Sequence, residues 1–319
     1  MLNAGETAVL LRSYDNILLL THVRPDGDTV GSAAALCAGL RALGKTAYLL
    51  PNPELTESTA PYARPYHAPP GFQPERVVSI DIASLSLLPE NARPYGARID
   101  LAIDHHPSHE GFAGAAIVRP EAAATGEIIY DILGLLGPIT ADMALPLYVA
   151  LATDTGCFAY SNTTAYTHAV AAALLRTGIN FQAVNKTFFR TKTRKRLQLE
   201  AAMLSGMEFH DLGRTVLLSV PLSLMERVRA TEYDAEDLSA LGGQIEGVDC
   251  AVTLRELRPD VWKISLRTGP RVNATKVCAL FGGGGHAAAA GCTIEGTPTQ
   301  VKERLLKGIA RIVPDFLDN

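Results

Sequence analysis

The stretch "THVRPDGDTVGS", residues 21–32, places three potential metal-binding side chains close together. They are His22, Asp26 and Asp28, and they follow the apolar run "NILLL" and precede an alanine-rich run. A turn between a strand and a helix needs a single Asp or Gly, not an imidazole and two carboxylates. Carboxylates combined with a few imidazoles are instead typical ligands of hard to borderline divalent cations such as Mn²⁺ and Mg²⁺.

Similar side chains end three other segments. Asp81 ends the apolar run "VVSID", Asp104, His105 and His106 end "LAIDHH", and Asp154 ends the helical run "LPLYVALATD". Because ligands of open α/β sheets bind at the carboxyl ends of the strands, these four segments predict one composite site. A carboxylate such as Asp81 could bridge two ions about 3.5–4 Å apart, which would clamp a phosphate and ionise a bridging water near neutral pH.

Each of these residues also has a purely structural interpretation. Asp26 and Asp28 in "DGDT" could cap the helix that follows them, and Asp81 could cap the next one. Either histidine of "DHH" could be an ordinary half-buried histidine, and Asp154 in "TDTG" could simply end a helix. Independent caps would not all be expected at one edge of one sheet, so the joint pattern favours a metal site.

Composition narrows the class of protein. The chain has 319 residues, of which 47% are hydrophobic and 19% charged, which fits two globular domains. Its net charge of −4 argues against a general affinity for polyanions. The N-terminus has no leader pattern and no apolar run approaches the roughly 20 residues that span a bilayer, so we expect a cytoplasmic protein without a membrane partner. Five scattered cysteines without a C-x-x-C pair make a disulfide framework or zinc knuckle unexpected.

The first half of the chain alternates short apolar runs with helical patterns. We predict helices at 29–45, 123–137 and 141–154, a Pro-rich loop at 51–75, and strands at 16–21, 46–50, 76–81 and 98–104. Continuous apolar strands separated by helices indicate an α/β domain, with a mostly parallel sheet covered by helices.

The pattern changes near residue 186. A long basic amphipathic helix is predicted over 185–204, and alternating strands with helices at 273–281 and 298–312 indicate a smaller α+β domain. The predicted organisation is a metal-binding catalytic domain over 1–185, a linker helix over 186–207 and a substrate-binding domain over 208–319. The five cationic residues of "RTKTRKR" (190–196) could follow a nucleic-acid backbone, although the solvated face of a helix is the commoner explanation.

The ordered motifs resemble those of the DHH phosphoesterase superfamily. "HVRPDGD", "SID", "DHH" and "ATDTG" are similar to its first four motifs, and "FGGGGHAAAAG" (281–291) resembles the glycine-rich motif of the DHH-associated C-terminal domain. Length and domain pairing look closest to the bacterial nanoRNase and pAp phosphatase branch. The resemblance implies an Mn²⁺-dependent phosphoesterase in which a hydroxide bridging two ions attacks the phosphate. Its substrates would be very short oligonucleotides (nanoRNA), cleaved to mononucleotides, and 3′-phosphoadenosine 5′-phosphate, converted to AMP.

The same resemblance assigns the metal ligands by position. Asp81 would bridge the two Mn²⁺ ions, for which Mg²⁺ is an alternative. The full set of implied ligands is His22, Asp26, Asp28, Asp81, His105 and Asp154. His22 and Asp26 would complete one ion's set and the other three ligands would complete the second. No ligand position is substituted.

The resemblance implies further roles in catalysis and substrate binding. Together with Asp81, the implied catalytic residues are Asp104, which would orient a ligand histidine, and His106, which would reach the scissile phosphate or the leaving group. Arg267 in "ISLRT" resembles the arginine that grips the terminal phosphate, a task suited to a guanidinium fork. The glycine-rich motif would offer backbone N–H groups to a phosphate or base, and its implied substrate-binding residues are Gly283, Gly284, Gly285 and His286.

Two other functions stay open. The same site could serve a phosphodiesterase acting on cyclic dinucleotides or on linear dinucleotides such as pApA. A nucleotide-binding sensor without turnover is a non-enzymatic alternative, against which the complete ligand set argues. The expected partners are short oligonucleotides or nucleotide phosphates, held at both ends when roughly two to five nucleotides long, and a homodimer is also possible.

Overall fold

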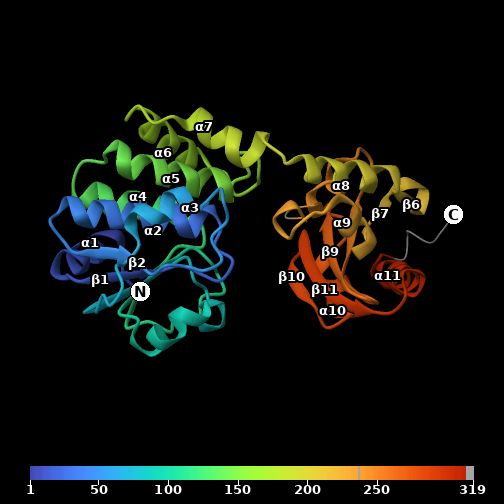
Figure 1. Ribbon diagram of the computed structural model, residues 1–319, viewed down its shortest axis with the longest axis horizontal. Helices are drawn as coiled ribbons and strands as arrows, with labels where there is room; N and C mark the ends of the chain where they lie inside the picture. Colours follow the sequence, from blue (N-terminus) through green and yellow to red (C-terminus); the bar gives the residue numbers. More distant parts are fainter. Residues whose placement is uncertain (236–237, 314–319) are drawn as a thin grey trace. The chain divides into compact units, whose positions relative to one another are not determined.

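The computed structural model describes residues 1–235 and 238–313, and the chain divides into two compact units, Met1–Thr191 and Lys192–Asn319 (Figure 1). Each unit has its own core of buried apolar side chains. Within the described residues, no helix is both long and apolar enough to cross a membrane.

The first unit is built on a sheet of five parallel strands in the order β2-β1-β3-β4-β5. Their bounds are β1 Ile17–Leu20, β2 Ala47–Leu49, β3 Arg76–Ile80, β4 Leu101–Asp104 and β5 Ala115–Val118. All four residues of β1 and of β4 are buried, as expected for strands covered on both faces. The predicted parallel α/β sheet is therefore confirmed.

The two faces of this sheet are covered differently. Alternate residues such as Ile17, Leu19 and Ile103 pack in one core with the helices, whereas Leu18, Leu20 and Val77 pack against residues 82–99, which form short 3₁₀ turns. The helices of the unit are α1 Ala4–Ser13, α2 Gly27–Ala42, α3 Ala60–Ala63, α4 Thr125–Leu136, α5 Ala141–Asp154, α6 Ala165–Leu175 and α7 Phe181–Asn185. The 3₁₀ segments are Arg64–Tyr66, Leu85–Leu87 and Glu90–Arg98.

Small residues bring the start of α2 to the end of α5. A Cβ atom added to Gly31 would lie 2.3 Å from the carbonyl oxygen of Pro146, and one added to Gly27 would lie 2.4 Å from the side chain of Thr153. The backbones of the two helices can therefore approach closely only because these positions are glycine. As a result, the first turn of α2 lies beside the last residue of α5, Asp154.

The second unit contains a mixed six-stranded sheet in the order β10-β11-β9-β8-β7-β6, in which only the β7–β8 pair is parallel. Its strands are β6 Glu208–His210, β7 Thr215–Val220, β8 Cys250–Arg258, β9 Val261–Thr268, β10 Gly284–His286 and β11 Ala289–Glu295. Its helices are α8 Arg194–Ser205, α9 Leu222–Val228, α10 Ala274–Ala279 and α11 Pro298–Ile312, with 3₁₀ turns at Asp211–Gly213, Tyr233–Ala235, Leu238–Ala240 and Gly242–Gln244. This confirms the predicted smaller α+β domain.

The helix predicted over 185–204 is interrupted. A π-helical turn, Lys186–Arg190, follows α7, and Thr191 is extended before α8 begins. The interruption has a local cause, because the Thr193 side chain accepts the Arg196 N–H at 2.9 Å and so starts a new helix. The boundary between the two compact units falls in this interruption.

Candidate metal centre

The structure brings the predicted polar side chains together at the carboxyl edge of the parallel sheet. His22 follows β1, Asp81 follows β3 and His105 follows β4, while Asp28 lies in the first turn of α2 and Asp154 ends α5. Three groups of potential ligand atoms each lie within 4.8 Å of one another: Asp28, His105 and Asp154; His22, Asp26 and Asp81; and Asp81, His105 and His106.

Two histidine rings are oriented with one nitrogen toward these carboxylates. His22 Nδ1 lies 2.8 Å from the Val23 carbonyl, and His105 Nδ1 lies 3.1 Å from the Ala122 carbonyl. Because a carbonyl can only accept, each Nδ1 carries a proton, and Nε2 is the ring nitrogen that can bind a cation once it has lost its own proton. His105 Nε2 is 3.4 Å from Asp154 Oδ2, and His22 Nε2 is 3.5 Å from Asp26 Oδ1. Metal-binding histidines are held in this way.

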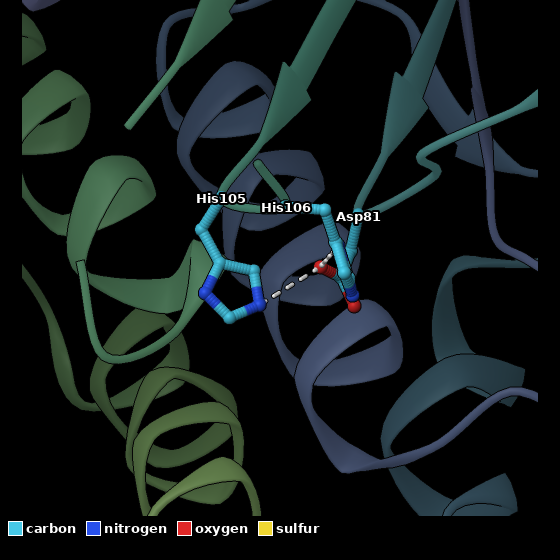
Figure 2. A group of neighbouring side chains, drawn as sticks. All are labelled: Asp81, His105 and His106. Atoms are coloured by element: carbon cyan, nitrogen blue, oxygen red, sulfur yellow. Dashed lines mark ion pairs between the residues drawn. The ribbon is translucent and has the colours of Figure 1, made fainter. Parts of the chain in front are cut away.

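Asp81 lies beside several histidines, and the dashed lines in Figure 2 join its carboxylate to His105 and His106. Its Oδ2 is 3.8 Å from His22 Nε2, and its Oδ1 is 3.7 Å from His105 Nε2, so its two oxygens face different rings. Its backbone is left-handed, with φ 61°, a conformation that aspartate tolerates better than most residues. Burial, together with the nearby Asp26 carboxylate, raises the pKa of Asp81 to about 7.

Asp28 is a buried carboxylate held by the start of α4. Its Oδ2 accepts the Thr125 N–H at 2.7 Å, and its Oδ1 accepts the Gly126 N–H at 3.0 Å and the Ser32 hydroxyl at 2.9 Å. Even so, burial and the charges of Asp81 and Asp154 raise the pKa of Asp28 well above its usual value. Several carboxylates gathered in a buried place are costly unless cations neutralise them, so this donor set fits divalent ions.

Asp26 combines the two interpretations that its sequence position allows. It is the N-cap of α2, and its Oδ1 accepts the N–H groups of Asp28 and Thr29 at 3.0 and 3.1 Å. The same oxygen faces His22. A cap that fixes this carboxylate on the helix start therefore also places it among the potential ligands.

His106 and Asp104 form a hydrogen-bonded pair beside Asp81. His106 Nδ1 donates to Asp104 Oδ1 at 2.8 Å, and the same oxygen accepts the backbone N–H groups of His105 and His106. This bond is the main reason that the pKa of His106 is raised to about 9, so the ring is protonated at neutral pH. Asp104 thus orients the ring of His106, whereas the ring of His105 is oriented by the Ala122 carbonyl.

Sequence reasoning missed the residues that hold the ligands. Thr125, Gly126 and Ser32 contact Asp28, and the Thr125 hydroxyl also donates to Asp81 Oδ1 at 2.8 Å. Asn162 donates to the carbonyl of Asp154 at 3.1 Å and ties the loop after α5 to the site. The only signal for α4 was "ATGE" at the start of a predicted helix, which does not reveal contacts to residues about 100 positions earlier.

The residues predicted to bind substrate lie in the second unit. In its sheet, Ala289 of β11 pairs with His286 of β10 on one side and with Arg267 of β9 on the other. Paired residues project from the same face, so the arginine and the histidine lie in one row about 9–10 Å apart at the usual strand spacing.

The glycine-rich motif is more ordered than a free loop. Gly284 and Gly285 lie in the edge strand β10, and the Gly283 N–H donates to the Cys278 carbonyl at 3.0 Å. That N–H is therefore occupied within the protein. A Cβ on Gly283 would lie 2.2 Å from the Gly291 carbonyl oxygen, so close backbone packing also accounts for this glycine.

Comparison with known proteins links both units to one group. Residues 16–152 match the DHH family, N-terminal domain, and residues 229–314 match the DHHA1 domain. Over 299 residues, 92% of this chain and 89% of the relative, the sequence is 33% identical to the bifunctional oligoribonuclease and PAP phosphatase NrnA of Thermus thermophilus.

Solved structures show the same fold. An exopolyphosphatase-related protein from Bacteroides fragilis aligns with a TM-score of 0.88 at 23% identity, covering 99% of this chain and 97% of that one. RecJ from Thermus thermophilus in complex with Mn²⁺ aligns with a TM-score of 0.55 at 13% identity, covering 97% of this chain and 55% of that one.

Proposed function

The chain belongs to the DHH family of metal-dependent phosphoesterases, and we propose that it hydrolyses very short oligonucleotides to mononucleotides and 3′-phosphoadenosine 5′-phosphate to AMP. The observation that carries the proposal is the convergence of His and Asp side chains from four segments, in a chain that aligns almost end to end with an oligoribonuclease and PAP phosphatase. Both reactions break a phosphorus–oxygen bond of a small nucleotide ester, so one site can serve them.

Two divalent cations, Mn²⁺ in the first instance, would be held by the six predicted ligands. Asp81 is the candidate for the shared ligand, because its two oxygens face His22 and His105. The same nitrogen of His105, Nε2, also lies 3.9 Å from Asp28 Oδ2 and 3.4 Å from Asp154 Oδ2. When bound, such ions lower the pKa of water and stabilise negative charge on phosphoryl oxygens.

Among the residues that are not proposed metal ligands, His106 is assigned a direct role in the reaction. Its ring is half-exposed, positively charged at neutral pH and fixed by Asp104. It can therefore donate a hydrogen bond to a phosphoryl oxygen or a proton to a departing oxygen. In the second unit, Arg267 and His286, in one row of the sheet, would bind the substrate's terminal phosphate or adjacent base.

The decisive experiment is turnover by the purified full chain with Mn²⁺, compared with EDTA. The panel consists of pAp, pApA, a cyclic dinucleotide, and RNA and DNA from 2-mers to 24-mers. We expect release of AMP from pAp and preference for the shortest oligonucleotides. A rate that rises with length, or exclusive activity on the cyclic dinucleotide, would overturn the assignment, and binding without turnover would favour a sensor.

Two variants separate the proposed roles. Asp81→Ala should abolish turnover, whereas Arg267→Ala should mainly raise KM and leave Mn²⁺ binding intact. Retention of a tenth of the activity by a correctly folded Asp81→Ala protein would contradict the shared-ligand assignment.

A further inference from the structure

Thr125, the first residue of α4, contacts two of the proposed metal ligands at once. Its N–H donates to Asp28 Oδ2 at 2.7 Å, and its hydroxyl donates to Asp81 Oδ1 at 2.8 Å. Its side chain is fully buried. We propose that Thr125 is a positioning residue that fixes the Asp81 carboxylate for cation binding, an inference that rests on the metal site of the proposed function.

The hydroxyl determines how the Asp81 carboxylate is rotated. The two oxygens of this carboxylate face different clusters, with Oδ2 toward His22 and Oδ1 toward His105. A hydrogen bond to one oxygen holds this rotation, because it fixes the plane of the carboxylate and hence the directions in which both oxygens point. Without it, the carboxylate would lose a hydrogen bond that restricts rotation about its Cβ–Cγ bond, because the nearby His106 Nδ1 already donates to Asp104.

Helix capping does not account for the Thr125 hydroxyl. A threonine at a helix start usually serves as N-cap and accepts a backbone N–H. In α4 the N-cap is Ala124, and no side chain makes a cap bond. The hydroxyl instead donates across to a carboxylate 44 residues earlier in the chain.

The segment that carries Thr125 is itself held rigidly. Glu127, a buried carboxylate, accepts the Thr167 hydroxyl at 2.6 Å and the Ala123 N–H at 3.2 Å. The preceding carbonyl, that of Ala122, orients the His105 ring. Residues 122–127 therefore contact three proposed ligands, and Thr125 accounts for two of them.

The test compares three variants of the full chain by calorimetric titration of the EDTA-treated protein with MnCl₂. Thr125→Val removes the hydroxyl but keeps the backbone N–H and the shape of the side chain. Thr125→Ser keeps the hydroxyl. Thr7→Val is the matched control, because Thr7 is a fully buried threonine of α1 whose hydroxyl donates to the Asn3 carbonyl at 2.8 Å, away from the site.

We expect Thr125→Val to bind Mn²⁺ about 10–100-fold more weakly at one or both sites, the usual effect of removing a group that orients a ligand. Thr125→Ser and Thr7→Val should bind within about threefold of the wild type. Equal affinity in Thr125→Val, or equal loss in Thr125→Ser, would overturn the inference. If Thr125→Val does not fold, Thr125→Ser is compared with Thr125→Ala instead. Both variants lack the methyl group, so weaker Mn²⁺ binding in Thr125→Ala alone would show that the hydroxyl, and not the packing of the methyl group, is required.

The wild-type titration keeps the two proposals apart. If the wild-type protein binds no Mn²⁺, the metal site of the proposed function is wrong. If it binds Mn²⁺ and Thr125→Val binds it equally well, only the role of Thr125 is wrong.

Discussion

Substitution of Gly126 by alanine should reveal how tightly α4 is pressed against α5. A Cβ on Gly126 would lie 2.7 Å from Ala150 Cβ and 2.8 Å from Leu151 Cδ1. Carbon atoms in contact prefer about 3.5–4.0 Å, so the start of α4 must shift by roughly 1 Å. Overpacking of this kind typically costs about 1–3 kcal/mol of the free energy of unfolding.

The same helix offers a matched control. Gly134 lies in α4 on the exposed side, and a Cβ there would have no atom within 4 Å. Because alanine is favoured over glycine in a helix by about 0.8–1.0 kcal/mol, Gly134→Ala should stabilise the protein. The two alanine variants should thus differ by about 2–4 kcal/mol in denaturant unfolding of the metal-free protein.

The displacement of the start of α4 in Gly126→Ala should also weaken metal binding. Asp28 Oδ1 accepts the Gly126 N–H at 3.0 Å, and an alanine Cβ would lie 3.6 Å from that oxygen. We therefore expect weaker Mn²⁺ binding in Gly126→Ala and unchanged binding in Gly134→Ala, measured by calorimetric titration. Equal stability of the two variants would refute the packing argument, and lower stability with undiminished Mn²⁺ affinity would refute the link between α4 and the site.

Two further predictions concern pH and the second unit. Four site residues have folded-state pKa values above their ordinary values: Asp81 (about 7), Asp154 (about 6), His22 (about 9) and His106 (about 9). Each group therefore holds its proton more tightly in the folded protein than in the unfolded chain. The metal-free protein should consequently lose stability as pH rises from about 4 to about 9. Thermal melts should show this decline, with Mn²⁺ raising the Tm more at pH 8 than at pH 6; a metal-free Tm that rises over the same range would contradict it. In the glycine-rich motif, Gly283→Ala should lower the Tm, because its Cβ would meet the Gly291 carbonyl oxygen at 2.2 Å, whereas Gly284→Ala, with nothing within 4 Å, should not. Equal melting temperatures for these two variants would show that the close packing at Gly283 does not determine the thermal stability.

The main elements of the fold were predictable because burial on both faces leaves a clear pattern. The run "ILLL" of β1 and the helix ending at Asp154 both have enough buried apolar residues to be recognised. β5 was not predicted, since only Ile117 of its four residues is buried, and an edge strand of this kind lacks a periodic signal. The break at Thr191 was missed because the apolar pattern continues across it while a threonine cap restarts the helix.

The sequence by itself determined which residue types follow which strands, and hence that His and Asp side chains would gather at one sheet edge. Parallel strands make this inference possible, because all their carboxyl ends lie on the same side. Only the tertiary structure decided how those side chains are held. The contacts from Thr125 and Gly126 to Asp28, and from the Ala122 carbonyl to His105, join segments with no local relation in sequence. Hydrogen bonds of this kind depend on the ångström-scale approach of α4 to α2 and α5, which packing of small residues sets and residue spacing does not encode.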